Sequence, residues 1–202
     1  HAREAEGQIL TRLTALSTAV TSSSVIGFGR DFLVQVGRAA TNYRFRHRLE
    51  ADAPLRLVAP AWVKDAMAAD LVLAMPGDNS LNAYAEIDGY LAARNVNVCW
   101  HIDDFTTAQS SGGMNEFPDT VVWYLFAEGT FLFLDGGTLD LGIIRDSTLV
   151  GTNDYKMFVE TFEGVAKVGV ESLKVSSTIN INGVAAALRD TLGGLTAATI
   201  EY

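Results

Sequence analysis

The sequence predicts an α+β fold, and three observations support that prediction. Of its 202 residues, 49% are hydrophobic and 19% are charged, which is typical of a folded chain with a sizeable core. Residues 121–134 are rich in β-branched and aromatic side chains and predict central strands. Apolar residues recur at helical spacing in residues 1–36, and helical and strand-like segments then mix without a regular strand–helix–strand rhythm.

Helices are predicted where apolar residues recur at spacings of three and four. Residues 1–22 carry one such stripe, made of Ile9, Leu13, Leu16 and Val20. Ser24 is expected to cap a second helix, with the stripe Val25, Phe28, Phe32 and Val36. Pro60 suits the entrance of a helix over residues 62–69, and residues 71–75 predict a short strand or helix end. A further helix is expected to begin at Asn79 or Ser80, to end at Arg94 and to turn four residues inward: Leu81, Tyr84, Ile87 and Leu91.

Strands are predicted where apolar and polar residues alternate. Residues 43–49 alternate in this way, which predicts an extended strand with Arg44, Arg46 and Arg48 on one face. Gly136 and Gly137 predict a tight hairpin turn, because glycine readily adopts positive φ, and a break is expected at Glu163-Gly164. Loop is predicted over residues 106–117 and a short helical pattern over residues 185–192. The remaining predicted strands cover residues 55–59, 96–100, 121–126, 130–134, 139–143, 155–161, 165–169 and 173–181.

Composition and charge exclude several classes of protein. The net charge of −9 and the pI of about 4.7 give no uniform basic footprint for nucleic acid. No apolar run approaches the ~20 residues of a membrane helix, and no signal peptide opens the sequence. Cys99 is the single cysteine, which excludes an internal disulfide and fits a reducing compartment. Its place in a strand between Val98 and Trp100 favours a buried structural thiol over a nucleophile.

The best candidate metal site is formed by His101, Asp103 and Asp104, which could bind a divalent ion in a metal-dependent enzyme. The chain has three histidines and no second ligand cluster of recognisable spacing, so we favour a solvated strand end with turn acids. No nucleophile–base pair and no phosphate loop stands out in the sequence. We therefore expect no enzymatic activity, no cofactor and no metal site.

The arginines at positions 44, 46 and 48 form the candidate contact site. Guanidinium groups bind phosphate or the carboxylates of a protein partner. Because the whole chain is acidic, we favour a protein–protein contact between subunits over a nucleic-acid contact for Arg44, Arg46 and Arg48.

Several phrases of the sequence resemble major capsid proteins of tailed bacteriophages, closest to those of phages infecting actinobacteria. The longest are WYLFAEGTF at residues 123–131 and LDGGTLDLG at residues 134–142. The resemblance covers the chain from about Pro54 to Ile181. Its shorter phrases are APLR at 53–56, Trp62-Val63, RDS at 145–147, TNDY at 152–155, ETFEGVA at 160–166 and GVESL at 169–173.

The resemblance implies the Hong Kong 97-type fold, with a peripheral domain (a spine helix and a long sheet) and an axial domain. Residues 1–50 would be the spine helix and its connection, and residues 51–134 the axial domain. Residues 135–181 would form the peripheral sheet, with residues 182–202 as a C-terminal segment. Family members carry an N-terminal arm and an extended loop before the spine helix, which we expect to be absent here. The chain lacks an initiator Met and is expected to be processed or a fragment that folds without closing a shell. No cross-linking lysine is carried over from the family.

The implied function is that of a structural major capsid protein of a tailed bacteriophage or prophage. Such proteins self-assemble into hexamers and pentamers of an icosahedral shell that encloses the DNA genome without specific recognition. The implied partners are capsomer neighbours, with scaffolding or decoration proteins as further candidates, and no membrane. The implied location is the virion capsid, assembled in the cytoplasm of the bacterial host. The alternatives are an encapsulin-type compartment shell and the metal-dependent enzyme built on His101, Asp103 and Asp104.

Overall fold

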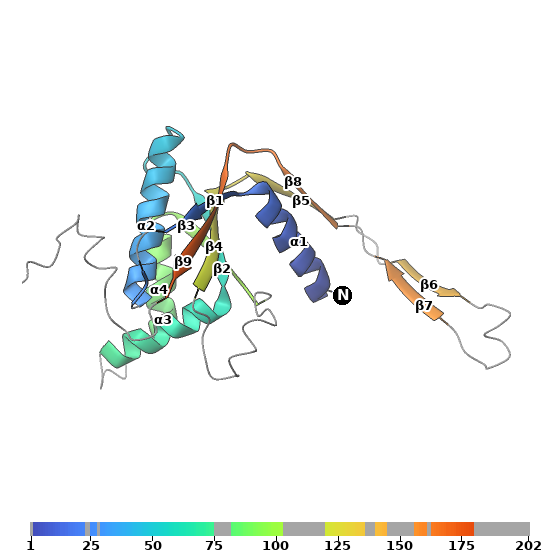
Figure 1. Ribbon diagram of the computed structural model, residues 1–202, viewed down its shortest axis with the longest axis horizontal. Helices are drawn as coiled ribbons and strands as arrows, with labels where there is room; N and C mark the ends of the chain where they lie inside the picture. Colours follow the sequence, from blue (N-terminus) through green and yellow to red (C-terminus); the bar gives the residue numbers. More distant parts are fainter. Residues whose placement is uncertain are drawn as a thin grey trace, which may run out of the picture.

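The structure is a computed structural model that describes residues 2–22, 25–27, 29–74, 82–102, 120–135, 140–144, 156–160 and 163–179. Its helices are α1 (Ala2–Leu16), α2 (Gly29–Arg46), α3 (Ala61–Ala74) and α4 (Ala83–Ala92). Its strands are β1 (Thr18–Thr21), β2 (Leu55–Pro60), β3 (Val96–His101), β4 (Thr120–Ala127), β5 (Phe131–Asp135), β6 (Asp140–Ile144), β7 (Lys156–Glu160), β8 (Glu163–Lys167) and β9 (Ser172–Thr178) (Figure 1). Helices surround a mixed sheet, which confirms the predicted α+β class.

A five-stranded sheet in the order β1-β9-β4-β2-β3 forms the centre of the molecule. β4 runs antiparallel to both β9 and β2, whereas β1 is parallel to β9 and β3 is parallel to β2. β4 lies in the middle because its residues are apolar on both faces: Trp123 and Leu125 belong to one hydrophobic cluster, and Tyr124 and Phe126 to another. The resemblance assigns residues 1–50 and 135–181 to the peripheral domain and residues 51–134 to the axial domain. Strands from all three of these ranges pair in this one sheet.

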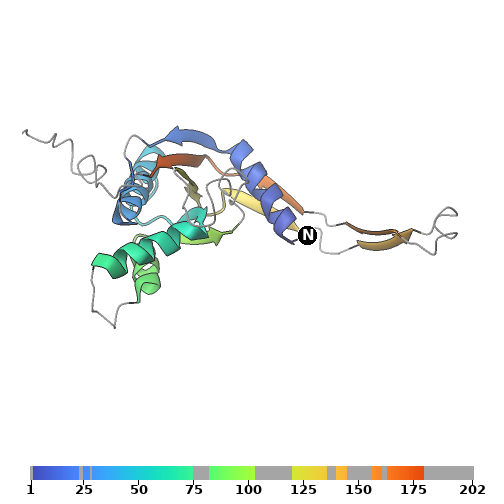
Figure 2. The ribbon, with the colours of Figure 1, turned by 60° about the horizontal axis from the view of Figure 1, so that its bottom comes forward.

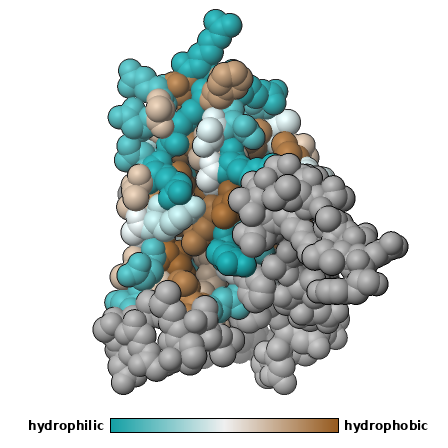
Figure 3. Space-filling view, turned by 90° about the vertical axis from the view of Figure 1, so that its left-hand side faces the viewer, coloured by the Kyte–Doolittle hydropathy of each residue, from teal (hydrophilic) through white to brown (hydrophobic). Residues whose placement is uncertain are grey.

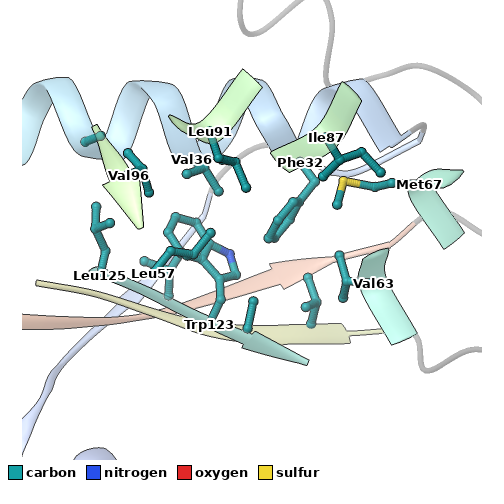
Figure 4. Packing of buried hydrophobic residues seen from close by; sticks show 14 of the residues in the cluster. Phe32, Val36, Leu57, Val63, Met67, Ile87, Leu91, Val96, Trp123 and Leu125 are labelled. Atoms are coloured by element: carbon teal, nitrogen blue, oxygen red, sulfur yellow. The ribbon is translucent and has the colours of Figure 1, made fainter. Parts of the chain in front are cut away.

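One face of the sheet is covered by α2, α3 and α4, which enclose the main hydrophobic core (Figure 4). Phe32 projects from α2 toward Trp123 on β4 and meets the indole ring edge-on, with 5.8 Å between the ring centroids. Met67 of α3 and Ile87 of α4 lie in the same core, and all four side chains are at most 2% exposed. A side chain buried this completely contributes about 1.5–3 kcal/mol to folding relative to an exposed one.

α1 covers the opposite face, so that the sheet lies between α1 and α2 (Figure 1). Leu13 on α1 is 3% exposed and packs in a second cluster with Tyr124, Phe126 and Phe131. The hydroxyl groups of Thr14 and Tyr124 lie 2.6 Å apart and form a hydrogen bond across this interface. The first helix therefore packs on the sheet through only part of its stripe, with Leu13 buried and Leu16 exposed.

We expect Leu13→Ala and Leu16→Ala to differ strongly in their effects on stability. Leu13 is 3% exposed and its truncation is expected to cost about 2–5 kcal/mol, the usual range for a buried leucine. The stripe alone predicts the same cost for Leu16, but Leu16 is 36% exposed, so its truncation is expected to cost less than about 1 kcal/mol. Urea unfolding of both variants is the measurement. Equal losses would mean that the end of α1 is buried against another surface in solution.

Two strand pairs follow β4, and together we call them the ribbon. β5 pairs with β8 and β6 pairs with β7, both antiparallel, and Figures 1 and 2 show β6 and β7 at the end remote from α2 and the sheet. At the base of the ribbon, Gly129 has a φ of +81°, and the carbonyl of Thr130 accepts hydrogen bonds from the N–H groups of Val168 and Gly169. A Cβ on Gly169 would lie 2.6 Å from the Cα of Thr130, so the two chain segments can meet this closely only at a glycine.

The predicted strand over residues 43–49 is wrong, because residues 29–46 form α2. Phe32, Val36, Ala40 and Tyr43 recur at spacings of four, four and three, and each is at most 2% exposed. The alternating apolar residues and arginines at positions 43–46 are the C-terminal end of this helical stripe. Over so few residues, the helical period of about 3.6 cannot be told from the strand period of about 2. Arg48 follows with a φ of +52° and lies outside any strand.

Other predicted boundaries also need correction. Residues 18–21 form β1 instead of continuing the first helix, and Val20 is 40% exposed there. The helix ends where Ser17 donates hydrogen bonds to the carbonyls of Thr14 and Leu13. Asn82 caps α4, while Asn79, Ser80 and Leu81 lie outside the described residues. Ile87 and Leu91 are buried as predicted, whereas Tyr84 is 47% exposed.

Gly136 and Gly137 lie outside the described residues, but the pairing predicted across them is wrong, because β5 pairs with β8 and β6 pairs with β7. The expected break at Glu163-Gly164 is also wrong, since both residues belong to β8. Strands are confirmed at most of the other predicted positions, namely β2, β3, β4, β5, β6, β7, β8 and β9. The predictions for residues 106–117 and 185–192 lie outside the described residues.

Candidate subunit-contact surfaces

Arg44 belongs to an internal junction. It is 8% exposed, and its guanidinium donates to the carbonyl of Ala53 at 3.0 and 2.8 Å and to that of Arg94 at 2.7 Å. A longer bond of 3.4 Å reaches the carbonyl of Asn95, which has a φ of +51°. Burial lowers the pKa of Arg44 below its ordinary value, and attraction to Asp52 opposes that shift. Arg44 thus ties the end of α2 to the turns before β2 and β3 and is not exposed to a partner.

Arg46 lies on the surface near Glu171. Its Nε is 3.5 Å from a carboxylate oxygen of Glu171, and its side chain is 69% exposed. The Nε2 of His47 lies 3.0 Å from the same oxygen, and the hydroxyl of Tyr43 donates to the carbonyl of Glu171 at 2.7 Å. Burial raises the pKa of Tyr43 above its ordinary value. Glu171 therefore joins the end of α2 to the start of β9, and Arg46 keeps most of its surface exposed.

The three arginines do not form the single face that alternation predicted. Arg44 points inward, whereas Arg46 and Arg48 are exposed at the end of α2. Seen from the side of α2, the surface is mostly hydrophilic, with apolar residues showing between the polar ones (Figure 3). A subunit contact through Arg46 and Arg48 stays a prediction.

The β5–β8 part of the ribbon exposes apolar residues. The sequence alone did not predict a contact site there. Phe131, at its base, is 6% exposed and packs edge-on against Phe126, with ring centroids 4.8 Å apart. Farther along β5 the exposed fractions rise to 50% at Leu132, 62% at Phe133 and 59% at Leu134. Successive strand residues face opposite sides, so both faces of the ribbon expose apolar groups. Beyond β8, Val168 and Val170 are 67% and 75% exposed.

Such a ribbon differs from scattered surface apolar residues. A two-stranded hairpin has marginal stability in water, and contiguous exposed apolar side chains mark interaction sites in many proteins. Leu132 and Leu134 share one face of β5 and Phe133 lies on the other. On β8, Leu132 pairs with Ala166, Leu134 with Gly164 and Phe133 with Val165. We name these exposed residues on the two faces of β5, Leu132, Phe133 and Leu134, the β5 apolar surface.

The candidate metal ligands are only partly described. His101 lies at the end of β3 and is 3% exposed, whereas Asp103 and Asp104 lie outside the described residues. Within the described ranges no group of three His, Cys, Asp or Glu side chains could hold a metal ion. The structure thus gives no geometry for the His101, Asp103 and Asp104 site.

Cys99 is exposed, which corrects the expectation of a buried thiol. It lies on β3, an edge strand of the five-stranded sheet. The two neighbours of Cys99 on β3, Val98 and Trp100, are half-buried and pack against the main core. Alternation along β3 turns Cys99 to the opposite, exposed side.

Comparison of the chain with protein-family models, curated proteins and solved structures finds no match. None of the helices in the described residues combines the length and apolar character needed to cross a membrane.

Proposed function

We propose that this protein is a structural shell protein, a major capsid protein of a tailed bacteriophage or prophage that assembles with copies of itself around DNA. The observation that carries the proposal is the ribbon of β5–β8 and β6–β7, which extends from a compact sheet-and-helix body (Figures 1 and 2). Its β5 apolar surface is exposed in the single chain. A projection of this kind can reach a neighbouring subunit and bury its apolar side chains there.

The sequence supports the same proposal. The capsid-like phrases WYLFAEGTF and LDGGTLDLG at residues 123–131 and 134–142 run from the central strand β4 into the ribbon. The Hong Kong 97-type fold belongs to this proposal. Capsomer neighbours are the proposed partners, and the virion capsid is the proposed location.

The proposal predicts that the chain associates with itself through the β5 apolar surface. Phe133→Asp places a charge on a side chain that is 62% exposed in the single chain. Because the charge would be desolvated in a contact, we expect association to weaken by about tenfold or more. Sedimentation velocity at several protein concentrations measures the effect, and electron microscopy shows the form of any particles.

The matched control is Phe45→Asp, which changes a phenylalanine on α2 that is 85% exposed. Both variants should melt near the temperature of the wild type, because neither side chain is buried. A wild-type chain that stays monomeric at every concentration tested would contradict the proposal. Association that survives Phe133→Asp would contradict the role of the β5 apolar surface.

A further inference from the structure

A groove of about 290 Å³ lies between α2 and β1, on the side of the sheet opposite α1. Its apolar floor is formed by Trp123, Leu173 and Val175, and Val20 of β1 forms one side. Arg38 and Arg46 of α2 line the other side. The groove combines an edge strand, an apolar floor and two cationic side chains in one place.

The strand edge next to the groove has backbone groups available for pairing. β1 is the last strand of the sheet on this side, and all four of its residues are exposed. The N–H of Ser22 donates inward to the carbonyl of Ser176 at 2.9 Å. Backbone groups alternate in direction along a strand, so those of Ala19 and Thr21 point to the outer edge. No described strand pairs with that edge.

The charges of the groove favour an acidic occupant. Arg38 is exposed and makes no hydrogen bond or ion pair with any described residue. Arg46 has the 3.5 Å ion pair with Glu171 but remains 69% exposed. Among the described residues, no aspartate or glutamate lines the groove. A carboxylate placed there would gain charge-assisted hydrogen bonds that the folded chain does not itself supply.

We propose that this groove binds an extended peptide segment of a partner protein, which adds as a strand to the outer edge of β1 and places a carboxylate beside Arg38. Main-chain hydrogen bonds to Ala19 and Thr21 provide affinity in this mode, and alternate side chains enter the groove and provide specificity. Apolar side chains of the peptide would lie beside Val20, with the acidic side chain toward α2.

A second copy of the chain is a poorer occupant. Pairing of β1 with β1 of another copy would be symmetric, so each groove would receive the same surface. The residues of β1 are Thr18, Ala19, Val20 and Thr21, which contain no carboxylate. Such pairing would leave Arg38 without an anion. A partner of different sequence can both hydrogen-bond to the backbone of β1 and place a carboxylate beside Arg38.

The test is selection of random eight-residue peptides, displayed on a carrier, against the whole chain. The enriched peptides should contain Asp or Glu among β-branched residues, and a fluorescein-labelled synthetic copy is then titrated by fluorescence anisotropy. Arg38→Glu should weaken its binding by about tenfold or more, because attraction becomes repulsion. Arg12→Glu, which changes an exposed arginine of α1 on the other face, should change binding by less than about twofold.

Amide hydrogen exchange gives an independent readout of strand addition. The bound peptide should slow exchange at Ala19 and Thr21, whose N–H groups point outward. The proposal is overturned if no peptide is enriched, if Arg38→Glu binds as well as the wild type, or if exchange at these two residues is unchanged. A further result would also overturn the proposal: no peptide is enriched, but the chain associates with itself and Arg38→Glu abolishes that association. The groove would then bind a second copy of the chain.

Discussion

Trp123→Ala is expected to lower the free energy of unfolding by about 3–5 kcal/mol, the range for truncating a large buried aromatic side chain. Trp123 is 1% exposed and lies on the central strand of the sheet. Its indole ring meets the ring of Phe32 edge-on, which adds about 0.5–1.5 kcal/mol beyond the buried area. The cavity left by alanine would face the core that α2, α3 and α4 enclose (Figure 4).

Trp123 also begins a buried chain of hydrogen bonds. Its indole N–H donates to the hydroxyl of Ser177 at 3.2 Å, and that hydroxyl donates to the side-chain carbonyl of Gln35 at 2.8 Å. Urea unfolding followed by circular dichroism measures the loss. Phe45→Ala, at a phenylalanine that is 85% exposed, is the control and should change stability by less than about 0.5 kcal/mol. Equal small effects for both variants would contradict the packing of β4 against α2.

Arg44→Leu is expected to cost about 2–4 kcal/mol of stability. The variant keeps a long apolar side chain but removes every donor to the carbonyls of Ala53 and Arg94. Hydrogen bonds from a charged donor contribute about 1.5–3 kcal/mol, and all three bonds to these carbonyls are lost together. Arg44→Lys should lose part of this stability, because a single ammonium group cannot reproduce the planar fork.

Arg46→Leu is the matched control, two residues along the same helix and 69% exposed. Its effect should stay below about 1 kcal/mol, as for other exposed ion pairs. Thermal melts and urea unfolding of the three variants check the order Arg44→Leu, Arg44→Lys, Arg46→Leu from largest loss to smallest. If Arg46→Leu were as costly as Arg44→Leu, the junction would not depend on the buried guanidinium.

The core strands could be predicted from sequence because their signal is local. Val121 to Phe126 is an apolar run that covers most of β4, and Leu55 to Ala59 is apolar except for Arg56 and covers most of β2. Phe32 and Val36 were correctly placed on one buried helical stripe, because several residues repeat at the helical period. Where the period is sampled only briefly, as at residues 43–49, alternation and helical spacing cannot be distinguished.

The contact surfaces could not be predicted because they depend on residues far apart in the chain. Arg44 is internal only because the carbonyls of Ala53 and Arg94 converge on it, and nothing near Arg44 in sequence signals that. The groove likewise joins Val20, Arg38 and Val175. The glycines at positions 136 and 137 suggested a turn, but the partner of β5 is β8, which no local pattern identifies.

The pairing of β1 with β9 determines when the chain can complete its fold. The hydroxyl groups of Ser17 and Ser172, 155 positions apart, lie 2.7 Å from each other where these strands begin. During synthesis at ~5–20 residues per second, β1 therefore waits roughly 8–30 s for its partner to leave the ribosome. In that interval the exposed edge of β1 is open to wrong pairing, as is that of β4 once it has been synthesised. Closing so long a loop also slows folding. Chaperone contact that covers these edges during translation should consequently favour a high yield of native protein.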